Sequence, residues 1–281
     1  MTGIEVLARN LSTRFGLALL IEHQEIEDGW KVRIRPDGLP PTIAFHVDLL
    51  MGWRRIKADF IPDNYASNLL RAMSQAVGSQ GKTFAVFARS LREKGGQVTL
   101  SLDDRPSDPV APDTWPVGWQ RISLHMQKIG VVSEVKGQYN IDGLFPWVAG
   151  FIGMVLALMP LEFVEEAEVS RLAVLTGEIE GESSQRTITV YERSRINRAA
   201  CIEIHGLNCK ICNFNFKEIY GDIGEGFIHV HHIHPLAHMK GSQVIDPVVD
   251  LLPVCPNCHC MLHRSDPPMD PDELREKLRC A

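Results

Sequence analysis

The chain has 281 residues, of which 44% are hydrophobic and 23% are charged. This length allows two domains, and the composition is that of an ordinary globular protein with a hydrophobic core. The formal net charge of -6 excludes a basic surface over the whole molecule. Any contact with nucleic acid must therefore come from a local patch.

Residues 1–176 mix helical and extended patterns, which predicts an α+β domain. Residues 3–22 are apolar at helical spacing, and further helices are expected over 64–77 and 83–94. Extended patterns predict strands over 30–35, 42–50, 54–61, 97–103 and 119–126. A proline-rich stretch predicts a loop at 103–118. No nucleotide-binding glycine loop and no clustered nucleophile and base occur here, so the sequence of this part does not state its role.

Residues 143–161, GLFPWVAGFIGMVLALMPL, carry no charge and approach the length of a membrane-spanning helix. Pro146 suits the start of a helix and Pro160 its end. Residues 147–159 between them are too few to cross a hydrocarbon core of about 30 Å. We therefore expect a buried core helix or a dimer-interface helix, with a membrane span as the alternative.

The N-terminal residues MTGIEVLARN lack the charged and apolar regions of a signal peptide, so a cytoplasmic protein without a membrane partner is expected. The composition changes at 176–185, TGEIEGESSQ, which is polar and contains several Glu and Ser residues. We expect a linker over 177–185, which would join domain 1–176 to a second domain formed by residues 186–281.

Cysteines occur only in residues 201–281, whereas a disulfide framework spread over a secreted domain would distribute them along the chain. Metal binding in a reducing cytosol is favoured instead. Two CxxC pairs place four thiols on two tight turns, as a tetrahedral structural zinc requires: Cys209, Cys212, Cys255 and Cys258. The remaining thiols lie outside this spacing and are interpreted as spare; they are Cys201, Cys260 and Cys280.

Histidines cluster on both sides of the second CxxC pair. His259 and His263 are four residues apart, so on a helix both would lie on one face and could bind one metal. A third ligand from the stretch HVHH would complete a three-nitrogen site with an open position, as in catalytic metal sites. We favour His231 over His229 for this ligand, because only His231 is followed by another histidine, His232, that could act as a general base.

The stretch QRTITVYERSRINRAACIEIHG carries a local excess of positive charge. DNA phosphates are expected to contact Arg193, Arg195 and Arg198. The alternative interpretation of these arginines is a solvated helix face.

The motifs CKIC, VHHIHPL and DLLPVCPNCHCMLH resemble the HNH nucleases, over residues 190–265. The resemblance is to the zinc-stabilised ββα-metal branch that includes methylation-dependent restriction enzymes of the McrA type. It implies that His231 binds the metal, that His232 is the general base and that His259 is a second ligand. His263 matches the further helix ligand of the colicin DNases.

The middle Asn of the family name falls on Asp250, nine residues before His259. An Asp carboxylate can accept the backbone N–H bonds that hold a loop, but it cannot donate as an amide can. Asn257, inside CPNC, is a second candidate for this position, although it belongs more naturally to the zinc turn.

The resemblance implies a metal-dependent DNA endonuclease that hydrolyses phosphodiester bonds to a 5′-phosphate and a 3′-hydroxyl, in restriction or antiphage defence. Its cofactors would be a structural Zn²⁺ and a catalytic Mg²⁺, Mn²⁺, Ni²⁺, Co²⁺ or Zn²⁺. The implied partner is DNA, either unmodified or carrying a modified base, and double-strand cleavage with one site per chain would call for a homodimer. Residues 1–176 would then serve target recognition or regulation, by analogy alone.

Two other hypotheses stay open. The first is a non-catalytic, zinc-stabilised module that binds DNA or another protein, in which His232 would have no catalytic use. The second is a membrane-tethered nuclease, which depends on residues 143–161.

Overall fold

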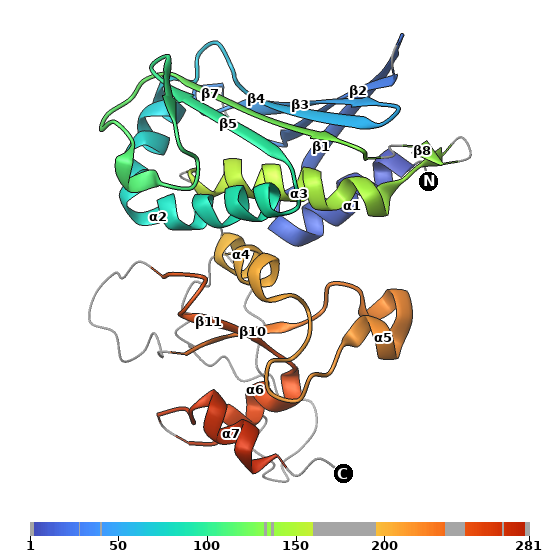
Figure 1. The fold of residues 1–281 in the computed structure, drawn as a ribbon, viewed down its shortest axis with the longest axis vertical. Coiled ribbons are helices and arrows are strands. Elements are labelled where there is room, and N and C mark those ends of the chain that lie inside the picture. The colour runs from blue at the N-terminus through green and yellow to red at the C-terminus, as the bar shows by residue number, and fades with distance from the viewer. Residues whose placement is uncertain are drawn as a thin grey trace, which may run out of the picture.

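The computed structural model describes residues 3–27, 29–39, 41–131, 134–135, 138–159, 195–233, 245–265 and 267–278. The protein is mixed α/β, with a helix-backed antiparallel sheet in the N-terminal part, residues 3–159, and a smaller C-terminal module, residues 195–278 (Figure 1). The expected linker at 177–185 lies outside the described residues.

A seven-stranded antiparallel sheet forms one layer of the N-terminal part, in the order β1-β2-β3-β4-β7-β5-β6. Its strands are β1 (Leu19–Ile26), β2 (Gly29–Pro36), β3 (Phe45–Gly52), β4 (Arg55–Pro62), β5 (Gln97–Leu102), β6 (Arg105–Ser107) and β7 (Ile122–Ile129). The register aligns buried side chains across the sheet, in the row Val32, Leu49, Ala58, Met126 and Val98. Because strand residues alternate between faces, this row and its neighbours make one apolar face.

Three helices cover that apolar face: α1 (Gly3–Phe15), α2 (Ser67–Glu93) and α3 (Ile141–Ala157) (Figure 1). The opposite face is polar, and on it Arg33 Nε donates to Asp48 at 2.8 Å across β2 and β3. The core of the N-terminal part therefore lies between the sheet and the helices.

The uncharged segment is the core helix α3, as its length predicted, with every residue from Trp147 to Ala157 buried. Among the described residues, no helix combines the length and the apolar character needed to cross a membrane. The helix begins at Ile141 and not at Pro146, because the Asn140 side chain caps it by accepting from Gly143 N at 3.1 Å. Pro146 lies early in the helix, where its missing N–H costs one bond.

Two other expectations of local structure were wrong. Residues 3–22 are not one helix: α1 ends at Phe15, Gly16 has a φ of +66°, and the largely exposed edge strand β1 follows. The segments 64–77 and 83–94 are parts of the single helix α2, which runs through Gly78 and Gly81. The weak helix propensity of these glycines does not end the helix, whose later turns pack against α3 through Phe87 and Leu91.

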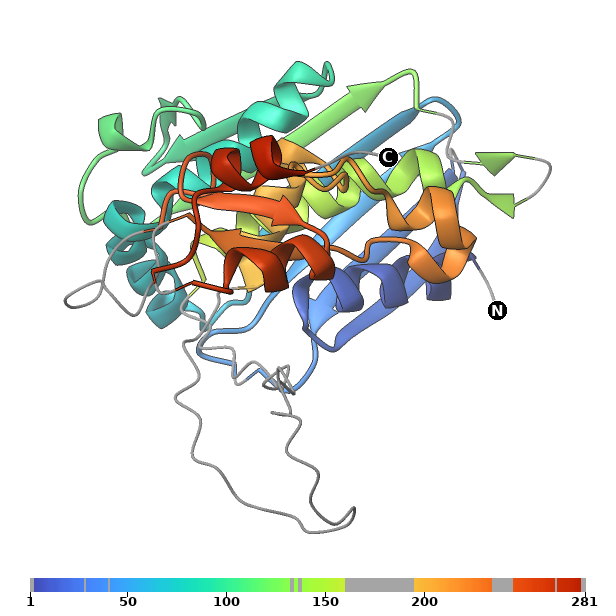
Figure 2. The same cartoon turned by 90° about the horizontal axis from the view of Figure 1, so that it is seen from below.

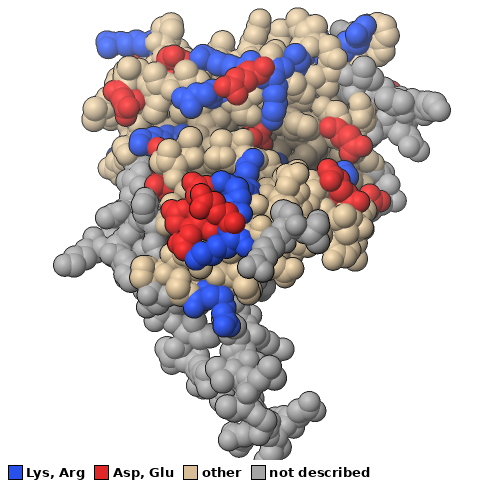
Figure 3. Space-filling model, turned by 60° about the horizontal axis from the view of Figure 1, so that its bottom comes forward, with Lys and Arg blue, Asp and Glu red and all other residues tan. Residues whose placement is uncertain are grey.

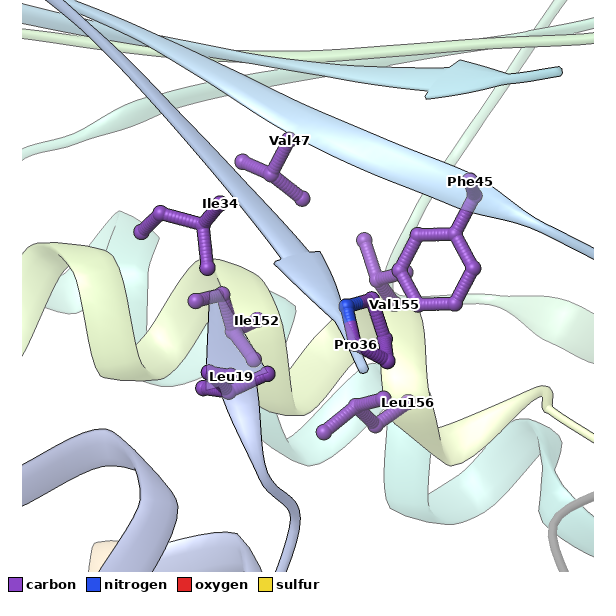
Figure 4. A pocket seen from close by; sticks show the side chains of 8 residues that line it. All are labelled: Leu19, Ile34, Pro36, Phe45, Val47, Ile152, Val155 and Leu156. Atoms are coloured by element: carbon purple, nitrogen blue, oxygen red, sulfur yellow. The ribbon is translucent and has the colours of Figure 1, made fainter. Parts of the chain in front are cut away.

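Shorter elements complete the N-terminal part: the 3-10 turn η1 (Pro112–Thr114) and the strand pair β8 (Glu134–Val135) and β9 (Gln138–Tyr139). A small pocket lies between β1, β2 and β3 and helix α3 (Figure 4). Only apolar residues line it, among them Ile34, Phe45 and Leu156, so it offers no chemical group to a ligand.

The C-terminal module consists of α4 (Arg195–His205), α5 (Phe216–Tyr220), the 3-10 turn η2 (Gly221–Gly224), β10 (His229–His232), β11 (Leu251–Val254), α6 (Pro256–Leu262) and α7 (Pro271–Lys277). The strands β10 and β11 form an antiparallel pair that leads directly into α6. The module lies against the helical layer, on the side away from the large sheet (Figures 1 and 2).

Candidate metal centres

The two CxxC pairs meet in one cluster. The sulfur atoms of Cys209, Cys212, Cys255 and Cys258 all lie within 4.8 Å of one another. The Sγ atoms of Cys212 and Cys255, one from each pair, are 3.7 Å apart. Cys212 lies nearest the surface, and the other three are buried in the hydrophobic cluster of the module.

Backbone bonds shape both cysteine turns. Asn213 N donates to Cys209 O at 2.8 Å, and Asn213 takes a left-handed φ of +61° that reverses the chain after Cys212. Cys255 is the N-cap of α6, where its sulfur accepts from Cys258 N at 3.4 Å. Lys210 N donates to Pro253 O at 2.9 Å, two residues before Cys255. This hydrogen bond connects the two cysteine turns.

The thiols differ in acidity. Burial alone would raise the pKa of Cys209, but backbone N–H groups, among them those of Cys212 and Ile211, stabilise its thiolate and lower the pKa. Burial raises the pKa of Cys258, and the neighbouring Cys255 raises it further. Four thiolates at this spacing repel one another unless a cation neutralises them. The donor set and its spacing therefore fit a tetrahedral zinc.

A second cluster joins His231, on β10, to His259, on α6, and to His263, just after α6. One ring nitrogen from each lies within 4.8 Å of the others. The ring centroids of His259 and His263 are 4.8 Å apart, and those of His231 and His263 are 5.1 Å apart. The set is graded in burial, since His231 is 2% exposed, His259 is half-buried and His263 is exposed. A metal held here would be reachable from solvent.

The neighbouring histidines of β10 lie close to this trio. His229 Nδ1 is 3.4 Å from His259 Nδ1, so His229 approaches the site from the same strand face as His231. His232 follows His231 directly, is half-buried, and pairs with Leu251 across the strands. Adjacent strand residues point to opposite faces, which places His232 outside the three-histidine set.

Asp250 closes the turn that enters β11. Its carboxylate accepts from Asp246 N at 2.8 Å, and its carbonyl accepts from Ile233 N at 2.9 Å, just after β10. Asp250, the residue expected to hold the loop, therefore accepts backbone hydrogen bonds both from the end of β10 and from the turn before β11. Asn257 lies in the first turn of α6 and is exposed.

The arginines expected to bind DNA have contacts inside the protein. Arg198 Nη2 donates to Ile228 O at 2.7 Å. The Arg195 guanidinium lies over Gly16, where a Cβ atom would be 2.1 Å from Arg195 Nη1. Arg193 lies outside the described residues. The expectation that these arginines bind phosphate stays a prediction.

Arg264, which directly follows His263, is exposed. Among the described residues, basic and acidic side chains are mixed on the face shown in Figure 3, without one continuous basic area.

Comparison of the chain with family models, curated proteins and solved structures finds no match.

Proposed function

We propose that this protein is a metal-dependent DNA endonuclease of the HNH type that hydrolyses phosphodiester bonds, in restriction or antiphage defence. The observation that carries the proposal is the histidine trio, which opens to solvent at His263 and lies beside a closed four-cysteine cluster. A closed thiol site is typical of structural zinc, and an open three-ligand site is typical of a catalytic metal.

The order of elements supports the same proposal. Two antiparallel strands, β10 and β11, lead into α6. The first strand supplies His231 and the helix supplies His259. A ββα unit with ligands on its first strand and its helix is what the resemblance to HNH nucleases implies.

Each residue then has a chemical role. Imidazole ligands suit Zn²⁺, Ni²⁺, Mn²⁺ or Co²⁺ better than Mg²⁺. A divalent ion bound by the trio would polarise the scissile phosphate and stabilise the leaving oxygen. His232 removes the proton from the attacking water, and Asp250 holds the turn that keeps β10 and β11 in register.

A second candidate function is a non-catalytic, zinc-stabilised module that binds DNA or a partner protein. The internal contacts of Arg195 and Arg198 favour its protein-binding form, because they occupy two side chains that any DNA-binding module would turn toward phosphates.

The deciding experiment compares two histidine variants on modified and unmodified DNA with a panel of divalent ions. His232→Ala should keep both metals and lose cleavage by about 10²- to 10⁴-fold, the usual share of a general base. His259→Ala should lose the second metal, and added metal should partly restore its cleavage but not that of His232→Ala. His23→Ala, on the edge strand β1, is the matched control and should cleave like the wild type. Wild-type rates in His232→Ala would refute the base, and a wild type inactive under all conditions would favour the binding module.

A further inference from the structure

Helix α4 belongs to two hydrophobic cores. Its residues Ile196, Ala199 and Ala200 are buried in the same cluster as α1, α2 and α3. Its Cys201 is buried instead against Val230 of β10 and Leu251 of β11. Burial raises the pKa of Cys201 to about 12, so this thiol is a neutral packing group.

The strand pair therefore lies between two helices, with α4 on one side and α6 on the other (Figure 1). Val230 faces α4, and the next residue, His231, faces the other two histidines of the trio. A two-stranded ribbon is marginally stable by itself and needs packing on its faces. The position of His231 thus depends on α4 as a back wall.

Glu203 fixes α4 on the N-terminal part. Its side chain is only 7% exposed, and Oε2 lies 2.6 Å from Arg14 Nη2 of α1. Ser90 Oγ of α2 donates to Oε1 at 2.7 Å, and Lys94, which follows α2, forms an ion pair with the same oxygen. Burial would raise the pKa of Glu203, but Arg14 and Lys94 outweigh it and lower the pKa, so the carboxylate is charged at neutral pH.

Two further contacts carry this anchoring toward the histidine site. Arg198 of α4 donates to Ile228 O at 2.7 Å, at the residue that precedes β10. Lys82 of α2 lies 3.0 Å from Asp246, whose backbone N–H donates to Asp250 in the turn that enters β11. Lys82 is 63% exposed, so this second pair contributes little alone. Buried Glu203 constrains the position of α4 more strongly, because moving a buried carboxylate away from its cationic partners would leave its charge uncompensated.

We propose that Glu203 is a positioning residue for the histidine site: it holds α4 against α1 and α2, and α4 sets the place from which β10 presents His231. The N-terminal part is then the platform on which the metal site is assembled. The inference rests on the proposed function only for its effect on cleavage, because its effect on metal binding can be measured without DNA.

The test uses the full-length, zinc-loaded protein and titrates Co²⁺ into the histidine site, followed by visible absorption. Glu203→Ala should weaken Co²⁺ binding by about tenfold or more, as loss of a residue that orients a ligand does. Glu203→Gln still accepts from Ser90 and should lose less. Zinc content should not change in either variant, and Glu276→Gln, an exposed glutamate of α7, should match the wild type.

A destabilised variant separates positioning from general stability. Leu49→Ala removes a fully buried side chain of the large sheet and should lower the melting temperature while Co²⁺ affinity stays unchanged. Unchanged Co²⁺ affinity in Glu203→Ala, or an equal loss in Leu49→Ala, would overturn the proposal. If Glu203→Ala does not fold, the same comparison is made with Glu203→Gln. A wild type that binds Co²⁺ but cleaves no DNA would refute the proposed nuclease activity. The role of Glu203 would still be decided by the Co²⁺ affinities of the variants.

Discussion

The two clusters of potential metal ligands share one helix but differ in exposure. Helix α6 supplies Cys258 to the cysteine cluster and the next residue, His259, to the histidine cluster. The cysteine cluster lies largely within a hydrophobic core, whereas the histidine cluster runs from buried His231 to exposed His263. One short helix therefore contributes to a largely buried set of thiols and to a set of imidazoles that reaches the surface, as a structural and an open metal site would each require.

Helix geometry explains the division. Successive residues of an α-helix differ by about 100° around the axis, so neighbours in the sequence face different partners. Cys258 faces the turn of Cys209 and Cys212, and His259 faces β10. The following turn brings His263 back to the face of His259, where His263 N donates to His259 O at 3.3 Å.

Loss of a cysteine ligand should have the largest effect. Cys258→Ser should release the structural metal and unfold the C-terminal module cooperatively, because metal binding and folding are coupled with a free energy on the order of 10 kcal/mol. Metal analysis and thermal unfolding measure this. A zinc-free wild type, or a variant of unchanged stability, would contradict a structural role for the closed cluster.

Loss of a histidine ligand should leave the fold in place. His259→Ala should weaken Co²⁺ binding at the histidine cluster by more than about 100-fold, beyond the loss caused by an outer-shell change, while the zinc stays bound. A chelator titration of the wild type should likewise remove the exposed metal first. Simultaneous loss of both metals would show that the two clusters are one unit.

The turn closed by Asp250 should respond to a graded change. Asp250→Ala leaves Asp246 N without its charged acceptor and should lower the free energy of unfolding by about 1–3 kcal/mol. Asp250→Asn keeps an acceptor oxygen and should lose less. Denaturant unfolding, with Co²⁺ affinity measured alongside, checks this order. Equal losses in both variants would mean that the carboxylate bond does not hold the turn.

The smallest effect is expected at Cys260, which lies between His259 and His263 in the sequence but is exposed and belongs to neither cluster. Cys260→Ser should change the free energy of unfolding by less than about 0.5 kcal/mol and alter neither metal content nor Co²⁺ affinity. Loss of either metal in this variant would show a wrongly chosen ligand set.

The sequence by itself determined which side chains could meet in the C-terminal module. Two CxxC pairs and histidines at i and i+4 carry their geometry in short spacings, since a turn or one helical turn brings such residues together wherever the segment lies. The structure accordingly groups Cys209 with Cys212, Cys255 with Cys258, and His259 with His263. The apolar run that forms α3 was also recognisable as a core or dimer-interface helix, because its length is a local property, and the structure shows it in the core.

Tertiary structure decided what no local pattern contains. Edge strand β1 is largely exposed and owes its extended form to pairing with β2, so its sequence had no strand alternation to display. Helix α2 continues through two glycines, and its later turns pack against α3. Glu203 meets Arg14 across a separation of 189 residues, and the cost of burying its charge is offset by cations from α1 and from just after α2 and by a hydrogen bond from Ser90. Such pairings depend on the whole fold, and this is why the anchoring of the histidine site on the N-terminal part could not be seen in the sequence.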